Sequence, residues 1–147
     1  MDHAAASAQL TDELGAIAVS LAALLGADLA ALLTSRAQDA ADRLTAQLTG
    51  PDADATAADL LSVLWPHSDP DPTWWASPLG LLIAPWWAAT HAEEGWTRAQ
   101  AAAVLGVTAG TVATLTSRGT LTQRQDGRVS VPSVISRLVR LAGRTAS

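Results

Sequence analysis

The sequence predicts a mainly α-helical protein with one small β-hairpin near its C-terminus. Apolar residues recur every three or four positions over residues 8–49, which is the period of one face of a helix. Alanine, the strongest helix former, supplies much of the 49% apolar content. Asp126-Gly127 lies between two short alternating runs, a pattern typical of a β-hairpin.

Residues 8–49 read as helix, with a break near the middle. An apolar stripe begins at Leu10, is interrupted at Gly26, resumes at Leu29 and ends before Gly50-Pro51. The pattern fits one long helix weakened at Gly26, or two helices folded into a hairpin. Its apolar face can pack within the chain or against a second copy, and both alternatives stay open. The first half of the stripe consists of Leu10, Leu14, Ile17, Leu21 and Leu24.

Residues 51–95 are expected to form a tryptophan-rich helical bridge. A short helix precedes Trp65, residues 66–72 form a proline-rich loop, and Ser77 can cap a helix that has Pro78 at its first position. Pro85 should kink or restart that helix. The side chains of Trp74, Trp75, Trp86 and Trp87 can fill a core or subunit interface, line a ligand pocket, or bind another protein.

The sequence of residues 96–118 predicts two short helices joined by a tight turn. Thr97 and Gln100 have the spacing of a capping box at the start of the first helix. Gly106 supplies the turn, and Val107 is expected in the core. Thr108 can then cap a second helix that runs to Arg118. Two short helices with a glycine in the turn are typical of the helix-turn-helix motif.

A hairpin and a last helix follow the two short helices. Residues 121–125 and 128–131 are the predicted arms of the hairpin, which would form the wing of a winged helix-turn-helix domain over residues 96–147. Pro132 opens the last helix, and its apolar residues share one side. These residues are Val134, Ile135, Leu138 and Leu141.

Charge is divided unevenly along the chain. Residues 1–95 hold two arginines against thirteen acidic residues, a charge of −11, and residues 96–147 hold seven arginines against Asp126 alone, a charge of +6. Such a contrast is expected when one part of a protein contacts nucleic acid. The helical region over residues 1–50 can then serve dimerisation.

Several classes of function are not expected. The chain has no cysteine, and its three histidines lack the repeated spacing of metal ligands, so no metal or other cofactor is expected. It has no nucleophile elbow and no phosphate-binding glycine loop, so an enzyme is not expected. The chain has no lysine and is rich in alanine and arginine, which suggests a GC-rich genome, bacterial or viral. We expect a cytoplasmic protein that does not enter a membrane, because Asp28 interrupts the apolar run and no basic segment precedes it.

The C-terminal motifs resemble the winged helix-turn-helix of the MerR and excisionase-like group over residues 96–141. The resemblance lies in residues 101–108, Thr111-Val112, residues 118–121 and 127–129, and Val131-Pro132. It implies that the second helix enters the major groove of DNA and that the wing contacts the backbone or minor groove. The nucleic-acid-binding residues it implies are Arg98, Thr108, Thr111, Thr114, Ser117, Arg118, Arg124 and Arg128.

The second helix departs from the family in its charge. It carries Ala113 and Thr114 where Arg or Tyr is common, and only Arg118 is charged, so hydroxyl groups would read the bases weakly. The expected function is double-stranded DNA binding by a homodimer that acts as a small transcriptional regulator or an excisionase-like architectural factor. The alternatives are an adaptor or antitoxin-like factor that binds a protein partner through its winged helix, and a ligand-responsive sensor with a Trp-lined pocket.

Overall fold

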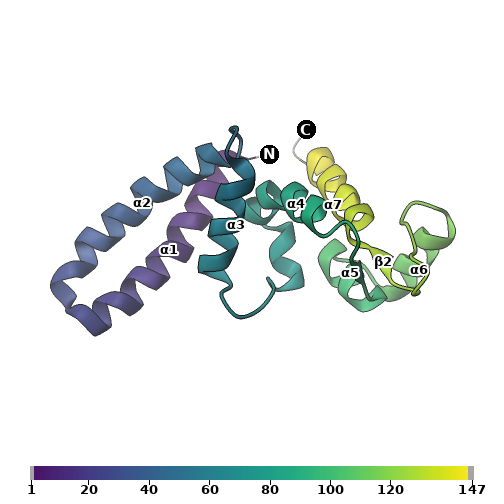
Figure 1. The fold of residues 1–147 in the computed structure, drawn as a ribbon, viewed down its shortest axis with the longest axis horizontal. Coiled ribbons are helices and arrows are strands. Elements are labelled where there is room, and N and C mark those ends of the chain that lie inside the picture. The colour runs from purple at the N-terminus through teal and green to yellow at the C-terminus, as the bar shows by residue number, and fades with distance from the viewer. Residues whose placement is uncertain (1, 146–147) are drawn as a thin grey trace. The chain divides into compact units, whose positions relative to one another are not determined.

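A computed structural model describes residues 2–145 of the chain (Figure 1). This part contains seven α-helices, two short 3-10 helices and a two-stranded antiparallel sheet, so the mainly helical fold is confirmed. It divides into two compact units, Asp2–His67 and the chain from Ser68 onward. The sequence placed its boundaries at residues 50 and 95 instead.

The N-terminal unit is built on a helical hairpin. Helix α1 (His3–Leu25) and helix α2 (Ala30–Gln47) pack along each other, joined through Gly26 and the 3-10 helix η1 (Ala27–Leu29). Gly26 has a φ of 114°, which side chains other than glycine rarely adopt, so the chain turns where the apolar pattern is interrupted. Of the two alternatives, the chain forms the hairpin. Helix α3 (Ala53–Leu64) follows and contacts α2.

Small side chains form the seam between α1 and α2. The predicted stripe is buried only in part: Leu10 is fully buried, Leu14 and Ile17 are half-buried, and Leu21 and Leu24 are exposed. Alanines let two helices approach closely, which leaves larger residues at the flanks of the seam. Among the described helices, α1 is long and apolar enough to cross a membrane by length and composition alone, and 17% of its apolar window is buried. The buried seam residues are Ala6, Leu10, Ala18, Ala22, Ala37, Ala41 and Thr45.

The second unit joins the tryptophan-rich segment to the C-terminal motifs. Its 3-10 helix η2 (Pro72–Ala76) packs on α5 (Arg98–Leu105), and α4 (Pro78–Thr90) packs on α7 (Val131–Thr145). The two segments therefore share one core, which is why no boundary falls at residue 95. Its fully buried side chains include Trp75, Leu79, Ile83, Val104, Val112, Leu121, Val129, Val131 and Val134.

Helix α4 begins as predicted and continues past its proline. Ser77 Oγ accepts a hydrogen bond from Gly80 N at 3.1 Å, and Pro78 occupies the first turn. The helix runs unbroken through the exposed Pro85 to Thr90, so it does not restart there. The buried residues of α4 lie before this proline, and they position the helix against the rest of the unit.

The small sheet joins the start of the C-terminal motifs to their end. Strand β1 (Gly95–Trp96) pairs antiparallel with β2 (Val129–Ser130), with Trp96 opposite Val129. Gln123 forms a further bridge to Val129. Two residues are too few to show an alternating pattern, so β1 could not be predicted from the sequence.

Candidate nucleic-acid interface

Helices α5 and α6 (Ala109–Ser117) are positioned by local hydrogen bonds. Thr97 Oγ1 accepts from Gln100 N at 3.2 Å, and Gln100 Oε1 accepts from Thr97 N at 2.9 Å, so the capping box is confirmed. Gly106 ends α5 in the left-handed conformation. Thr108 Oγ1 accepts from Thr111 N at 3.1 Å and caps α6. The bend between the two helices is 100°, so α6 projects from α5 at nearly a right angle.

The turn between these helices lies at the surface. Val107 was expected in the core, but it is exposed, and that prediction is wrong. Its N–H donates to Ala102 O at 3.0 Å, which closes the last turn of α5 and leaves the side chain outside. Val112, fully buried, and Leu115, half-buried, hold α6 on the core instead.

One side of α6 presents hydroxyl groups to solvent. Thr114 Oγ1 donates to Gly110 O at 3.1 Å, and Ser117 Oγ donates to Thr114 O at 2.9 Å. Because these protons are used within the helix, the hydroxyls offer outside it mainly the lone pairs of their oxygens. The structure brings all five predicted positions of this helix to the surface: Thr108, Thr111, Thr114, Ser117 and Arg118 are exposed.

The arms of the predicted hairpin are joined by backbone hydrogen bonds and one isolated bridge, whereas the two-stranded sheet pairs β2 with β1. Arg124 N donates to Arg128 O at 2.8 Å, and Ser130 N donates to Thr122 O at 2.8 Å, which pairs the two arms. Gly127 N donates to Arg124 O at 3.1 Å across the turn, and Gly127 has a φ of 81°. The turn therefore needs glycine at its last position.

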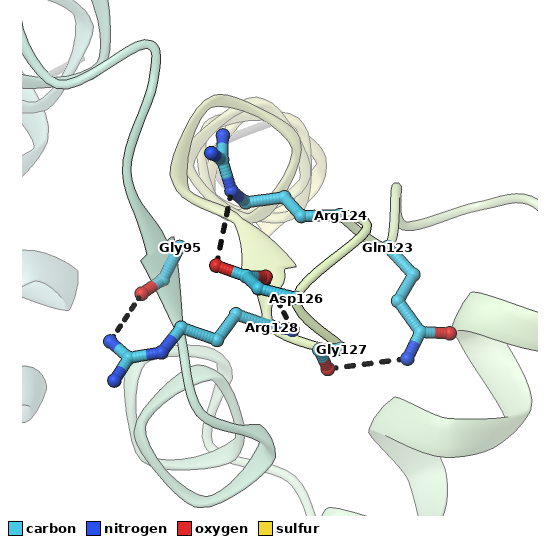
Figure 2. Close-up of polar contacts among 6 residues, drawn as sticks. All are labelled: Gly95, Gln123, Arg124, Asp126, Gly127 and Arg128. Carbon is cyan, nitrogen blue, oxygen red and sulfur yellow. Dashed lines mark hydrogen bonds and ion pairs between the residues drawn. The ribbon is translucent and has the colours of Figure 1, made fainter.

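The two hairpin arginines lie over strand β1 (Figure 2). Arg124 Nε is 3.7 Å from Asp126 Oδ2, and Arg128 Nη1 donates to Gly95 O at 3.3 Å. A Cβ on Gly95 would lie 2.7 Å from Arg124 Cδ and from Arg128 Cβ, so only glycine leaves room for both side chains. Arg124 is half-buried and partly neutralised by Asp126, whereas Arg128 is exposed. The role of Gly95 could not be predicted from neighbouring residues, because Arg124 and Arg128 are more than 25 residues away in the sequence.

The remaining arginines of this unit lie on two helices. Arg98, a predicted contact, is exposed at the first residue of α5. Arg137, Arg140 and Arg144 were not predicted as site residues, yet they line one small cavity on α7. Their spacing of three and four residues is the signal that could have identified them.

The tryptophans pack largely against one another. Trp75 is only 2% exposed, and its ring centroid lies 5.4 Å from that of Trp74 and 5.0 Å from that of Trp87. Trp87 stacks on His91 with centroids 3.6 Å apart. Trp75 therefore belongs to the core of the unit, whereas Trp74, Trp86 and Trp87 are half-buried.

A wider hollow of about 430 Å³ lies between α1 and α2, in the N-terminal unit. Its lining includes Ser7, whose hydroxyl donates to the Asp42 carboxylate, and no tryptophan. Within residues 2–145, no three His, Asp or Glu side chains gather as a metal site would require.

No protein-family model matches the sequence, and no curated protein or solved structure matches it either. The resemblance to the MerR and excisionase-like group therefore stays a prediction that rests on the quoted residues.

Proposed function

We propose that the chain is a small DNA-binding protein in which α5, α6 and the hairpin over residues 122–130 act as a winged helix-turn-helix. Helix α6 enters the major groove, and Arg124 and Arg128 on the hairpin contact the backbone. The 100° bend and the three-residue turn between the helices support this geometry.

The observation that carries the proposal is the pairing of an exposed polar helix face with an excess of arginine. Residues 96–147 hold seven arginines against one acidic residue, and phosphate neutralisation supplies most of the non-specific affinity for DNA. The exposed face of α6 has Arg118 at its end and hydroxyls along its length. This face of α6 would hold the helix in the groove, and its hydroxyl groups would discriminate only weakly among bases.

A gel shift with the DNA upstream of the protein's own coding sequence, over a salt series, tests the proposal. The wild type should bind, with affinity that falls steeply as salt rises. Arg118→Ala/Arg124→Ala/Arg128→Ala should weaken binding strongly. The matched control is Arg36→Ala/Arg43→Ala, which removes two exposed arginines from the N-terminal unit. The proposal fails if the wild type binds no duplex at low salt, or if both variants behave alike.

We also propose that the protein is a homodimer joined through the end of the α1–α2 hairpin. Leu24 is 84% exposed, Leu25 66% and Val19 64%, and these residues are close together in the sequence near the turn. Large exposed apolar patches mark interaction sites. Leu24→Asp should shift sedimentation toward the monomer, whereas the control Val63→Asp, at an exposed site on α3, should not.

The same apolar residues favour a second candidate function, an adaptor that binds a protein partner through the end of the α1–α2 hairpin and not through the winged helix. The two functions make opposite predictions about DNA. An adaptor would bind no duplex in the salt series, and Leu24→Asp would abolish capture of its partner while leaving the protein folded.

A further inference from the structure

Helix α7 has two chemically distinct sides. Val131, Val134, Ile135 and Leu138 are buried, at the spacing of one helix face. At 100° per residue, Arg140 and Arg144 fall on the opposite side of the helix, and the half-buried Arg137 lies between them and the buried face. The three arginines therefore form a stripe along the side of the helix that faces away from the core or borders it.

The three arginines surround a common space. Together with Leu141 they line a cavity of about 50 Å³. Arg140 Nε donates to Ser136 O at 3.2 Å, which holds that side chain along the helix. Cavities that bind organic ligands are several times larger, about 300–1,000 Å³, so this space suits a single small anionic group.

Acidic residues are few in this part of the sequence. Asp126 is the only acidic residue after Glu94, and it pairs with Arg124. Within residues 2–145, neither Arg137 nor Arg140 forms an ion pair with a carboxylate. Like charges at this spacing destabilise a helix, so an anion between them would relieve the repulsion. Guanidinium groups bind phosphate oxygens through paired hydrogen bonds.

The stripe continues to the base of the hairpin. Ser133 lies one turn before Arg137 on the same side of α7. Its Oγ accepts from Thr122 N at 3.1 Å and donates to Ser130 O at 2.8 Å, so it joins the helix to both arms of the hairpin. The arginine stripe therefore adjoins the element proposed to contact the DNA backbone.

We propose that Arg137, Arg140 and Arg144 bind backbone phosphates of duplex DNA as a second contact beside α6 and the hairpin. This inference rests on the proposed function. From Arg137 to Arg144 the helix rises about 10 Å, and phosphates of one strand are spaced about 3.4 Å along the duplex axis. The stripe is thus long enough to follow two or three phosphates. These contacts would raise the affinity for DNA and orient the protein on the duplex, but they would not distinguish one base sequence from another.

Fluorescence anisotropy with a labelled 20-base-pair duplex over a salt series tests the stripe in the full-length protein. Arg137→Gln/Arg140→Gln/Arg144→Gln should lower the slope of log affinity against log salt by about 2 to 3, because each phosphate contact contributes about 0.9. Arg137→Lys/Arg140→Lys/Arg144→Lys keeps the charge and should keep the slope. Arg36→Gln/Arg43→Gln is the matched control and should change nothing.

Two further outcomes separate this inference from the proposed function. If the wild type binds DNA and the α7 glutamine variant keeps its full slope, the stripe is not a phosphate contact, although the protein still binds DNA. If the wild type binds no duplex, both proposals fail as stated. NMR spectra of the arginine Nε–H groups, recorded in inorganic phosphate and in sodium chloride of equal ionic strength, then show whether the cavity binds free phosphate instead. Thermal melting confirms that each variant is folded.

Discussion

At two positions of the second unit, neighbouring atoms lie so close to the backbone that only glycine fits. Gly80, in the first turn of α4, faces the backbone of η2, and a Cβ there would lie 2.3 Å from Trp74 O and 2.9 Å from Trp75 Cα. Gly95 plays a similar part beneath the two hairpin arginines. The neighbours of Gly80 are backbone atoms, and Arg128 Cβ beside Gly95 is attached to the backbone, so these atoms cannot move away easily, whereas Arg124 Cδ belongs to a flexible side chain.

Gly80→Ala should destabilise the protein by about 1–3 kcal/mol or more, because the added methyl overlaps backbone that cannot shift alone. The free energy of unfolding in urea measures the effect. Gly143→Ala is the matched control, because a Cβ there meets nothing within 4 Å and should improve helix propensity. Equal stability of the two variants would contradict the packing of η2 against α4.

A capping carboxylate makes one contribution to stability depend on pH. The Thr73 hydroxyl and then the Thr73 N–H, at 2.6 and 2.9 Å from Asp71 Oδ1, lower the pKa of Asp71. The pKa of Asp71 in the folded protein lies below its unfolded value of about 3.9. The stability that the ionised carboxylate contributes is therefore present above the unfolded pKa and is lost as pH falls through the folded pKa.

Thr73→Val should raise the pKa of Asp71 toward its ordinary value, because the substitution removes the largest cause of the shift. Carbon-13 NMR titration of the Asp71 carboxyl measures it directly. Thr90→Val, at an exposed threonine of α4, is the control. An unchanged titration in Thr73→Val would show that the hydroxyl does not hold the carboxylate.

Among the secondary-structure elements, the short helices depend on their caps. Helix α5 has eight residues and α6 nine, and helices this short are unstable alone. Their capping residues, Thr97 and Thr108, were identified from the sequence because a cap is a local hydrogen bond. The same holds for Gly106 and for the hairpin turn at Gly127.

Thr97→Ala should cost about 1 kcal/mol of stability, because it leaves the first N–H groups of α5 without the hydroxyl acceptor. Thr97→Ser keeps that acceptor and should restore most of the loss. Chemical denaturation compares the two variants with the wild type. If the alanine and serine variants are equally stable, the capping box does not stabilise the helix in solution.

Within the whole molecule, the second unit is larger than the segment that resembles a DNA-binding domain. Helix α4 covers α7, and η2 covers α5, so residues 68–94 complete the core on which α6 and the hairpin rest. A domain beginning at residue 96 would leave those apolar faces in water.

A fragment of residues 68–147 should fold alone, whereas a fragment of residues 95–147 should not, because the shorter one lacks η2 and α4. Thermal melting followed by circular dichroism distinguishes the two. The longer fragment should melt cooperatively, and the shorter one should give a broad, weak transition. A cooperative transition at the same temperature in both fragments would show that α4 and η2 add no stability.

The sequence by itself determined what depends on neighbouring residues: the helical class, the caps at Ser77, Thr97 and Thr108, the hairpin turn, and the concentration of arginine after residue 96. The tertiary structure decided what depends on distant residues. In the tertiary structure α1 and α2 fold into a helical hairpin, and alanines are buried between them in place of Leu21 and Leu24. Gly95 packs against the β-hairpin arginines, and the tryptophan-rich segment joins the C-terminal core. A cap or turn is closed by groups a few residues apart, whereas burial depends on which surfaces meet, and that is set by the packing of the whole unit.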